Sequence, residues 1–387
     1  MLALDDLDTP ATDRLDAIAD AERQRQHLPG LAVAVARRGE ILHAGGYGAA
    51  SLELAVPVTP ETVFCIGSLT KQFTAALTLQ LVETGTLHLD EPVYPHFADR
   101  LEARIPSEFR EAWRQITVRH LLTHTSGLKR DPVRFRPTEN TLPPNYIPDL
   151  YAWARQEFTG NDLLDQLAML PLDFAPPGTK MSYSNAGYTL LGLLIEKVTG
   201  HSFAACLRER ITGPLGMTAT RLTEEEVIPH LANGYTWAGE EEGGWRKGGY
   251  LNPTRDAAAG SLVSTVLDLV RWDSAFHDDA FLLPASRAAL WTPAALNDGT
   301  TLPYGLGWGV GTRAEGAGPH HWVGHGGMWG GFTSHWVRFV EKDLTVVALT
   351  NLGISGRVPG GGQRGEPGQV SWLLAAQFLP GLPRPGS

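Results

Sequence analysis

The sequence is poor in cysteine, in positive charge and in long apolar runs. Its 387 residues include two cysteines, Cys65 and Cys206, and 32 lysines and arginines against 42 aspartates and glutamates. Two cysteines so far apart form neither a CxxC redox motif nor a set of zinc ligands, so we expect both to be buried and reduced. The net charge of -10 argues against nucleic-acid binding, because proteins that bind phosphate backbones usually present a basic face.

Signals for export and for membrane insertion are also missing from the sequence as given. The first residues, MLALDDLDTPATDRLDAIAD, are acidic where a secretory signal is basic, and no apolar run reaches the length of a membrane span. We therefore expect a cytoplasmic protein without membrane contact. Apolar residues are nevertheless plentiful, because 43% of the chain is hydrophobic and 19% charged, which is enough for a sizeable core.

Strand signals occur near both ends of the chain. A helix is predicted from about Thr12 to Gln26, followed by two strands in LAVAVARRGEILHAGGYG with a hairpin turn at Arg38-Gly39. Near the other end, FTSHWVRFV and LTVVALTNL predict two strands with a turn between them, and QVSWLLAAQFL predicts a last helix.

Helical patterns dominate the middle of the chain. SLVSTVLDLVRWDSAF predicts a helix after Ala259, and the proline-rich stretch from Asp131 to Pro148 is too apolar for a linker, so it predicts an ordered loop. We predict an α/β fold with a mostly antiparallel sheet flanked by helices. Residues 1–90 and 260–387 would form this lobe, residues 91–259 an inserted all-helical lobe, and the active site would lie between them.

A hydroxyl and an amine one helical turn apart are the first chemical signal. IGSLTKQFTAALTLQLVETGTL predicts a long amphipathic helix with Ser68 in its first turn and Lys71 three residues later, on the same face. A serine is a weak nucleophile until a base takes its proton. An amine can be that base if burial lowers its pKa from about 10.4 toward neutrality.

The same spacing occurs a second time, at Ser126 and Lys129. Ser126 is followed by Gly127 and then by Arg130-Asp131-Pro132, which indicates a loop rather than a rigid helix. A helix cap followed by a solvated lysine explains this second copy, and we set it aside.

Two further polar segments carry groups suited to the same chemistry. Tyr183 and Asn185 stand two apart before a predicted helix, where a phenol can exchange protons and an amide can orient a lysine or a carbonyl. His325-Gly326-Gly327 precedes a predicted strand, where glycines permit an extended substrate to approach the sheet edge. Taken alone, the first segment is better explained as a buried tyrosine with a capping asparagine, whereas a tight turn between strands is the weaker explanation of the second.

Together the three segments resemble the serine β-lactamase-related family, in its branch of class C β-lactamases, D-aminopeptidases, D,D-carboxypeptidases and carboxylesterases. SLTK, YSN and HGG stand for its SxxK, YxN and KTG or HxG motifs. LLTHTSGL, PPGTKMSYSNAGYTLLGLLIE, PLGMTAT, AAAGSLVSTVLDLVRW and YGLGWG also look like the family, so the resemblance spans roughly residues 28 to 352.

The resemblance implies a role for each motif residue. Ser68 would be the nucleophile, activated by Lys71, and Tyr183 the general base and later the proton donor to the leaving group. Asn185 would bind Lys71 or a substrate amide, and the backbone N–H groups of Ser68 and Met328 would form the oxyanion hole. The division of the base role between lysine and tyrosine stays open.

One departure from the family pattern bears on the substrate. His325 stands where β-lactamases and D,D-peptidases typically carry a lysine, and a histidine is mostly neutral at pH 7. A neutral ring is a weak anchor for a carboxylate. We therefore expect hydrolysis of small amides, peptides or short esters, including those with a D-configured residue, rather than efficient β-lactam hydrolysis, and no cofactor. A weak β-lactamase or a D,D-carboxypeptidase is the nearest alternative.

Two readings from other classes compete. His120 and His124 have helical i, i+4 spacing, and His320, His321 and His325 cluster later, yet HLLTH lacks the glutamate of HExxH and no third ligand is evident, so we expect no metal. A catalytically silent binding protein on the same fold would show a broken motif, whereas all three motifs are whole.

Overall fold

The structure is a computed structural model that describes residues 11–131, 157–223, 227–241, 244–249, 252–314, 318–357, 363–379 and 381–382. Residues 132–148 of the predicted proline-rich loop lie outside these ranges. No single described helix is long and apolar enough to span a membrane. Among the described residues, one pair of consecutive helices, Asn185–Thr199 and Phe203–Thr212, has the length and composition for a span when taken together, but the pair is bent by 82°.

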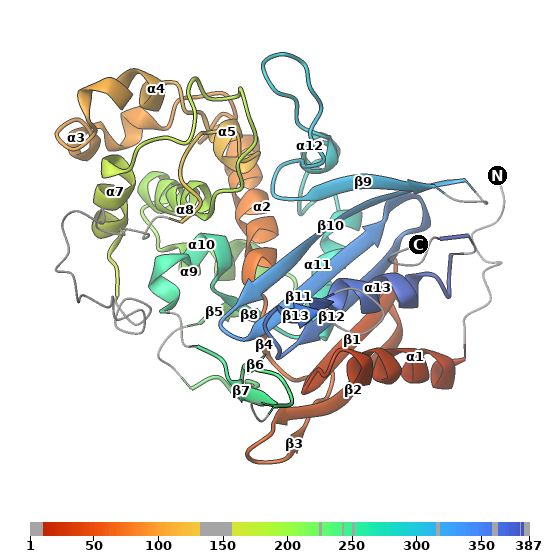
Figure 1. The fold of residues 1–387 in the computed structure, drawn as a ribbon. Helices are drawn as coiled ribbons and strands as arrows, with labels where there is room; N and C mark the ends of the chain where they lie inside the picture. Colours follow the sequence, from red (N-terminus) through yellow and green to blue (C-terminus); the bar gives the residue numbers. More distant parts are fainter. Residues whose placement is uncertain are drawn as a thin grey trace.

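One seven-stranded antiparallel sheet joins the two ends of the chain (Figure 1). Its strand order is β3-β2-β1-β12-β11-β10-β9, so the N-terminal hairpin pairs with the C-terminal strands through β1 and β12. The bounds are β1 Gly30–Arg37, β2 Glu40–Ser51, β3 Val56–Pro57, β9 Gly309–Ala314, β10 Pro319–Trp329, β11 Phe332–Phe339 and β12 Leu344–Thr350.

The predicted hairpin turn forms at Arg38-Gly39. Both residues have a positive φ, 53° and 77°, which matches the right-handed twist of the flanking strands and which glycine adopts at no steric cost. The prediction of two strands joined at this dipeptide is confirmed.

The sheet is covered by helices on both faces. Alternate residues of β1 enter different cores: Ala32 and Ala34 face one, and Leu31 and Val33 face the other. On the alanine side lie α2 (Thr70–Glu83) and α11 (Val266–Ser274). The opposite face is covered by α1 (Thr12–Arg25) and α13 (Pro367–Ala375). The near-continuous apolar run of β1 follows from this double burial.

Most helices of the central segment gather on one side of the sheet, in the upper left of Figure 1. Their long member, α8 (Asn185–Thr199), packs on α2, and this contact positions the site. The others are α3 Ala98–Leu101, α4 Arg110–Arg114, α5 Val118–Leu122, α7 Gly160–Met169, α9 Phe203–Leu207 and α10 Ala257–Gly260, with α12 Pro284–Trp291 later in the chain.

Short strands occur where the sequence predicted only helix. SLVSTVLDLVRWDSAF does not form one continuous helix: Leu262–Ser264 is a strand, β8, and α11 begins only at Val266. The reason is tertiary, because β8 pairs with β4 (Phe64–Cys65) just before Ser68 and with β5 (Arg221–Leu222). The central segment also contains a small hairpin, β6 Tyr235–Trp237 with β7 Trp245–Lys247, and β13 Ser355–Arg357 pairs with β14 Gln363–Arg364 near the C-terminus.

The division of the chain into one lobe of residues 1–90 and 260–387 and a second lobe of residues 91–259 stays a prediction.

Candidate active site

Ser68 lies in a short 3₁₀ turn, η1 (Gly67–Leu69), that leads directly into α2. Gly67 has a φ of 54°, a left-handed conformation that glycine adopts without strain. The Thr70 hydroxyl donates a hydrogen bond to the Gly67 carbonyl at 2.7 Å and accepts one from the Leu262 amide of β8 at 3.2 Å. The unpredicted strand β8 therefore fixes the turn that presents Ser68.

Lys71 is fully buried in the first turn of α2, and three oxygens surround its amine. Nζ lies 3.1 Å from Ser68 Oγ, 2.8 Å from Asn185 Oδ1 and 2.6 Å from the Ala259 carbonyl oxygen. Two of these partners come from segments more than 100 residues away along the chain. The predicted Ser-Lys pair is thus formed, and the amine is held in place by groups outside its own helix.

Burial lowers the pKa of Lys71 to about 7, with Asp256 and Asp131 partly opposing the shift. The desolvation of a charged amine is the physical cause. At physiological pH a large fraction of an amine with this pKa is neutral, and only the neutral amine can accept a proton.

Tyr183 places its ring beside both groups. The Lys71 amine lies 4.9 Å from the centre of the ring, and Tyr183 and Ser68 line the same cavity. Burial raises the pKa of Tyr183 well above its ordinary value, against the opposing effect of the neighbouring Ser68 hydroxyl. At neutral pH this side chain is therefore a phenol and not a phenolate.

Asn185 is oriented by polar groups at both ends of its amide. Its Oδ1 accepts from Lys71, and its Nδ2 donates to Asp131 Oδ1 at 2.9 Å. Ser184, not Asn185, caps α8, because the Ser184 hydroxyl accepts a hydrogen bond from the Gly187 amide. Asn185 is thereby left to face Lys71.

His325 faces the same space from β10, but both of its ring nitrogens already have partners. Nε2 lies 2.9 Å from the Tyr304 hydroxyl, and Nδ1 lies 2.5 Å from the Gly326 carbonyl. A carbonyl can only accept, so Nδ1 carries the proton and Nε2 accepts from Tyr304. Burial first, and Lys71 second, lower the pKa of His325 to about 3, so the third motif supplies no positive charge.

The other two residues of the third motif bring β10 against the serine turn. A Cβ atom on Gly67 would lie 2.4 Å from the Met328 amide nitrogen, and one on Gly327 would lie 2.0 Å from the Ile66 carbonyl oxygen. Backbones approach this closely only where side chains are absent. The two segments predicted to form the oxyanion hole, at Ser68 and Met328, are therefore neighbours.

Rival nucleophiles and pairs have other roles. Ser126 is buried and accepts a hydrogen bond from the Leu128 amide, while Lys129 forms an ion pair with Asp173 at the surface. Both cysteines are free and buried, as predicted. Burial raises the pKa of Cys65 to about 12, which makes its thiol unreactive.

Two of the histidines weighed as zinc ligands, His120 and His124, accept hydrogen bonds from backbone amides. His120 Nδ1 accepts from the Thr117 amide, and His124 Nδ1 accepts from the Ser184 amide while its ring lies 4.2 Å from that of Tyr183. In the part of the chain that the structure describes, no group of three or more His, Cys, Asp or Glu side chains could hold a metal ion.

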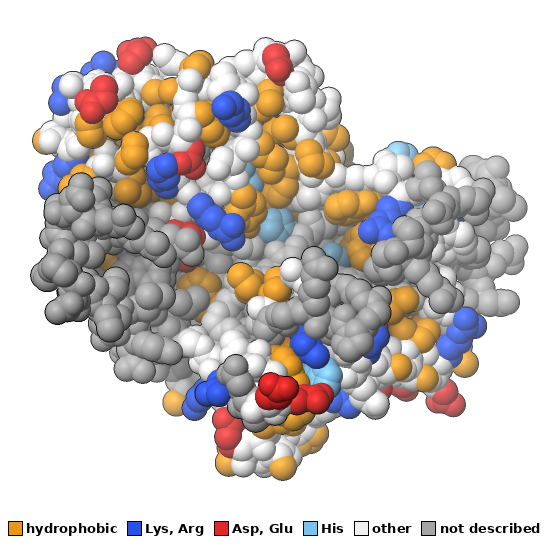
Figure 2. All heavy atoms as spheres, in the orientation of Figure 1, with side chains coloured by type: hydrophobic (Ala, Val, Ile, Leu, Met, Phe, Trp, Pro, Cys, Tyr) orange, Lys and Arg blue, Asp and Glu red, His pale blue; other side chains and the backbone are white. Residues whose placement is uncertain are grey.

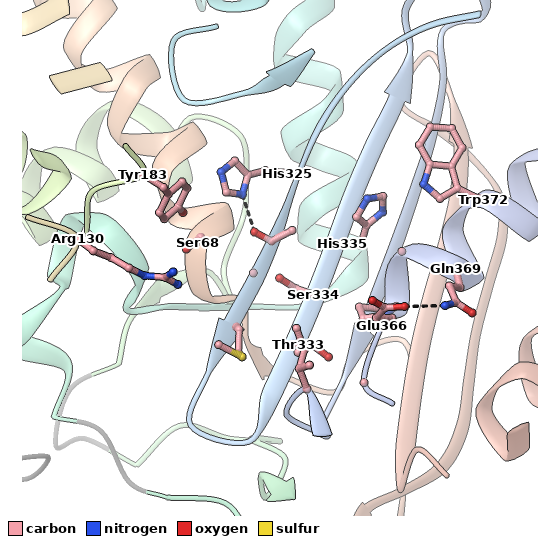
Figure 3. Close-up of a pocket in the computed structure, with 17 residues that line it drawn as sticks. Ser68, Arg130, Tyr183, His325, Thr333, Ser334, His335, Glu366, Gln369 and Trp372 are labelled. Carbon is pink, nitrogen blue, oxygen red and sulfur yellow. Dashed lines mark hydrogen bonds between the residues drawn. The ribbon is translucent and has the colours of Figure 1, made fainter. Parts of the chain in front are cut away.

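A cavity of about 550 Å³ opens in front of Ser68. It runs from Arg130 and Tyr183 across His325–Met328 of β10 to β11 and α13, where Glu366, just before the helix, and Trp372 within it contribute to the wall (Figure 3). Figure 2 shows the hollow on this face, with histidine side chains at its floor. Its size suits a small-molecule substrate.

A profile of the Beta-lactamase family matches residues 15–361. The chain belongs to the Beta-lactamase family. Penicillin-binding protein 4* of Bacillus subtilis (strain 168) is 30% identical over 82% of this chain and 67% of its own length. D-aminopeptidase of Gluconobacter oxydans (strain 621H) is 31% identical over 87% of this chain, which spans 58% of that enzyme. D-amino acid amidase from Ochrobactrum anthropi SV3, solved with L-phenylalanine amide, superposes with a TM-score of 0.67 at 27% identity, covering 88% of this chain and 90% of that one.

Family membership confirms the predicted fold class and the predicted class of enzyme, a serine hydrolase of the Beta-lactamase family. The fold also brings in residues that the sequence interpretation missed. Arg130 lines the cavity, Asp131 holds Asn185, Tyr304 holds His325 and His124 stacks on Tyr183. In the sequence, Arg130 and Asp131 indicate only a loop, and Tyr304 is only part of a supporting segment, YGLGWG.

Proposed function

We propose that this protein hydrolyses small amides, short peptides or esters through an acyl-enzyme formed on Ser68, with Lys71 as the base of acylation. The observation that carries the proposal is the 3.1 Å approach of the Lys71 amine to the Ser68 hydroxyl at the wall of the cavity.

The surroundings of the amine favour Lys71 over Tyr183 as the first base. A neutral amine has two N–H donors and one lone pair. The carbonyl oxygens of Asn185 and Ala259 accept from the two donors, and the lone pair is then left for the Ser68 hydroxyl proton. A pKa of about 7 keeps this form of Lys71 populated, whereas burial raises the pKa of Tyr183 and makes its phenolate scarce at neutral pH.

The proposed reaction then balances in two steps. The Ser68 proton passes to Lys71 as Oγ bonds to the substrate carbonyl carbon, and the Ser68 and Met328 amides stabilise the oxyanion. The bond to the leaving group breaks as that group takes a proton from the Tyr183 phenol, which is replenished by the Lys71 ammonium. Water attacks the acyl-enzyme by the reverse proton path and releases the acid.

The substrate class rests on the third motif and on the relatives. His325 is neutral with both ring nitrogens engaged, which disfavours the ionic anchoring of a carboxylate by this motif. Relatives are named D-aminopeptidase and D-amino acid amidase. We therefore include amides and short peptides with a D-configured residue, and we expect weak hydrolysis of β-lactams.

The test is covalent labelling followed by mass spectrometry. A fluorophosphonate probe should add one mass increment per chain, located on Ser68, and Ser68→Ala should abolish labelling and lower turnover at least about a thousandfold. Ser126→Ala is the matched control, because Ser126 begins the second SxxK copy and is not among the residues that line the cavity. If Ser68→Ala is still labelled and Ser126→Ala is not, the assignment of the nucleophile is reversed. A wild-type protein that is not labelled and turns over no ester, amide or β-lactam would indicate a catalytically silent binding protein.

A further inference from the structure

The cavity contains one guanidinium that the proposed reaction does not use. Arg130 is exposed, lines the cavity together with Ser68, and has its charged carbon 5.8 Å from the centre of the Tyr183 ring. In Figure 3 its side chain extends toward Ser68. The group therefore stands next to the bond that would be cleaved.

The backbone that carries Arg130 is held firmly. Its carbonyl oxygen accepts hydrogen bonds from the Asn185 and Ala186 amides at the start of α8, and the preceding carbonyl, of Lys129, accepts one from the Ser184 hydroxyl. The guanidinium thus projects from the same loop contact that orients Asn185 toward Lys71. Such pre-organisation lowers the entropy lost on binding a ligand.

Arg130 takes part in no ion pair among the residues that the structure describes, although the carboxylates of Asp131 and Asp256 act with it on Lys71 and Tyr183. The neighbouring Lys129, by contrast, is paired with Asp173. Asp131 is next in the chain, but its Oδ1 accepts from Asn185 and it is not part of the cavity wall. Glu366, the carboxylate on the wall, accepts from Gln363 and Gln369 at the α13 end of the cavity.

We propose that Arg130 binds a carboxylate of the substrate, so that the site favours amides or esters bearing a negative charge close to the scissile bond. Guanidinium groups bind carboxylates through paired, charge-assisted N–H donors. Arg130 would thereby supply the cation that the His325 motif lacks, from the opposite wall of the cavity. The inference rests on the proposed function, because it places the charge relative to acylation at Ser68.

The experiment compares pairs of an anionic and a neutral ester that differ mainly in one carboxylate. One pair, 3-carboxyphenyl acetate and phenyl acetate, puts the charge on the leaving group, and the other, the monophenyl ester of adipic acid and phenyl hexanoate, puts it on the acyl group. For each pair the ratio of kcat/KM, anionic over neutral, is measured in the wild type, Arg130→Gln, Arg130→Lys and Lys129→Gln. The ratio cancels any effect of Arg130 on the reactivity of Lys71 itself.

In at least one pair we expect Arg130→Gln to lower the ratio by roughly ten- to a hundredfold, the range of a hydrogen bond to a charged group. Arg130→Lys should retain part of the preference, because it keeps the charge and loses the paired donors. Lys129→Gln removes the same charge one residue earlier without touching the cavity, and should leave the ratio unchanged. The pair that responds identifies the side of the scissile bond on which the carboxylate binds.

Three results would overturn the inference. Equal ratios in the wild type and Arg130→Gln for both pairs would show that Arg130 does not bind the carboxylate, while turnover and Ser68 labelling would leave the proposed function standing. An equal fall in Lys129→Gln would show a long-range effect of net charge. A wild type that hydrolyses none of the four esters and does not label at Ser68 would overturn the proposed function, and this inference with it.

Discussion

Replacing Gly327 by alanine should separate the strand β10 from the serine turn with a single methyl group. The new Cβ would lie 2.0 Å from the Ile66 carbonyl oxygen and 2.3 Å from Ser334 Oγ, whereas Cβ atoms essentially never approach within 3.0 Å. Ile66 precedes the turn that carries Ser68, and its carbonyl accepts hydrogen bonds from the Ser334 hydroxyl and the Leu69 amide. The two backbones must therefore part by at least about 1 Å, the scale of misplacement that costs a hundredfold in rate.

The expected magnitude follows from the Met328 amide, which is next to Gly327 in the chain. Removing one oxyanion-hole donor typically lowers kcat by about 10²- to 10³-fold, and we expect kcat/KM for a small acetate ester to fall by that factor. The rate of Ser68 labelling by a fluorophosphonate should fall in parallel. Crowding of this kind should also reduce the free energy of unfolding by about 1–3 kcal/mol, measured by urea denaturation.

The neighbouring glycine provides the control. A Cβ on Gly326 would have the Ser334 carbonyl oxygen, at 3.7 Å, as its nearest neighbour, which is ordinary van der Waals contact. Gly326→Ala should therefore lose less than about tenfold in kcat/KM with the same small ester. If Gly327→Ala and Gly326→Ala have the same kcat/KM, then β10 does not abut the serine turn and the proposed oxyanion hole is wrong.

Two further predictions concern pH and stability. Because Lys71 must be neutral to accept the Ser68 proton, kcat/KM for a neutral ester should rise with pH, with its midpoint near pH 7, and be lost as the pH falls below that value. In a profile measured from about pH 5 to 10, a midpoint near 10 would contradict a buried base. Asp273→Ala should reduce the free energy of unfolding by about 3–5 kcal/mol, since it leaves the buried Arg338 without its 2.6 Å partner. Arg38→Ala, which breaks the more exposed pair with Asp343, should cost less than about 1 kcal/mol in the same urea titration, and equal losses would refute the distinction.

Local sequence was sufficient where neighbouring residues make the structure. The i, i+3 spacing on one helix predicts that Ser68 and Lys71 meet, and they do, at 3.1 Å. The Arg38-Gly39 dipeptide predicts a hairpin because its own backbone conformations close it. The three motifs, read together, also pointed to the family that the comparisons establish.

Long-range pairing decided what those local patterns could not. Residues Leu262–Ser264 lie within a sequence pattern that predicts a helix, yet they form a strand because they pair with β4. The sequence marks Arg130 only as part of the loop after the second SxxK copy, whereas hydrogen bonds to the start of α8 hold its backbone beside the cavity.

The sequence by itself determined which groups could react: a hydroxyl, an amine and a phenol in three separate motifs. Only the tertiary structure decided their chemical state. Lys71 is a candidate base because Asn185, 114 residues away, and the Ala259 carbonyl enclose its amine, and burial lowers its pKa to about 7. Desolvation depends on every segment that packs around a group, so no spacing of residues along the chain can specify it.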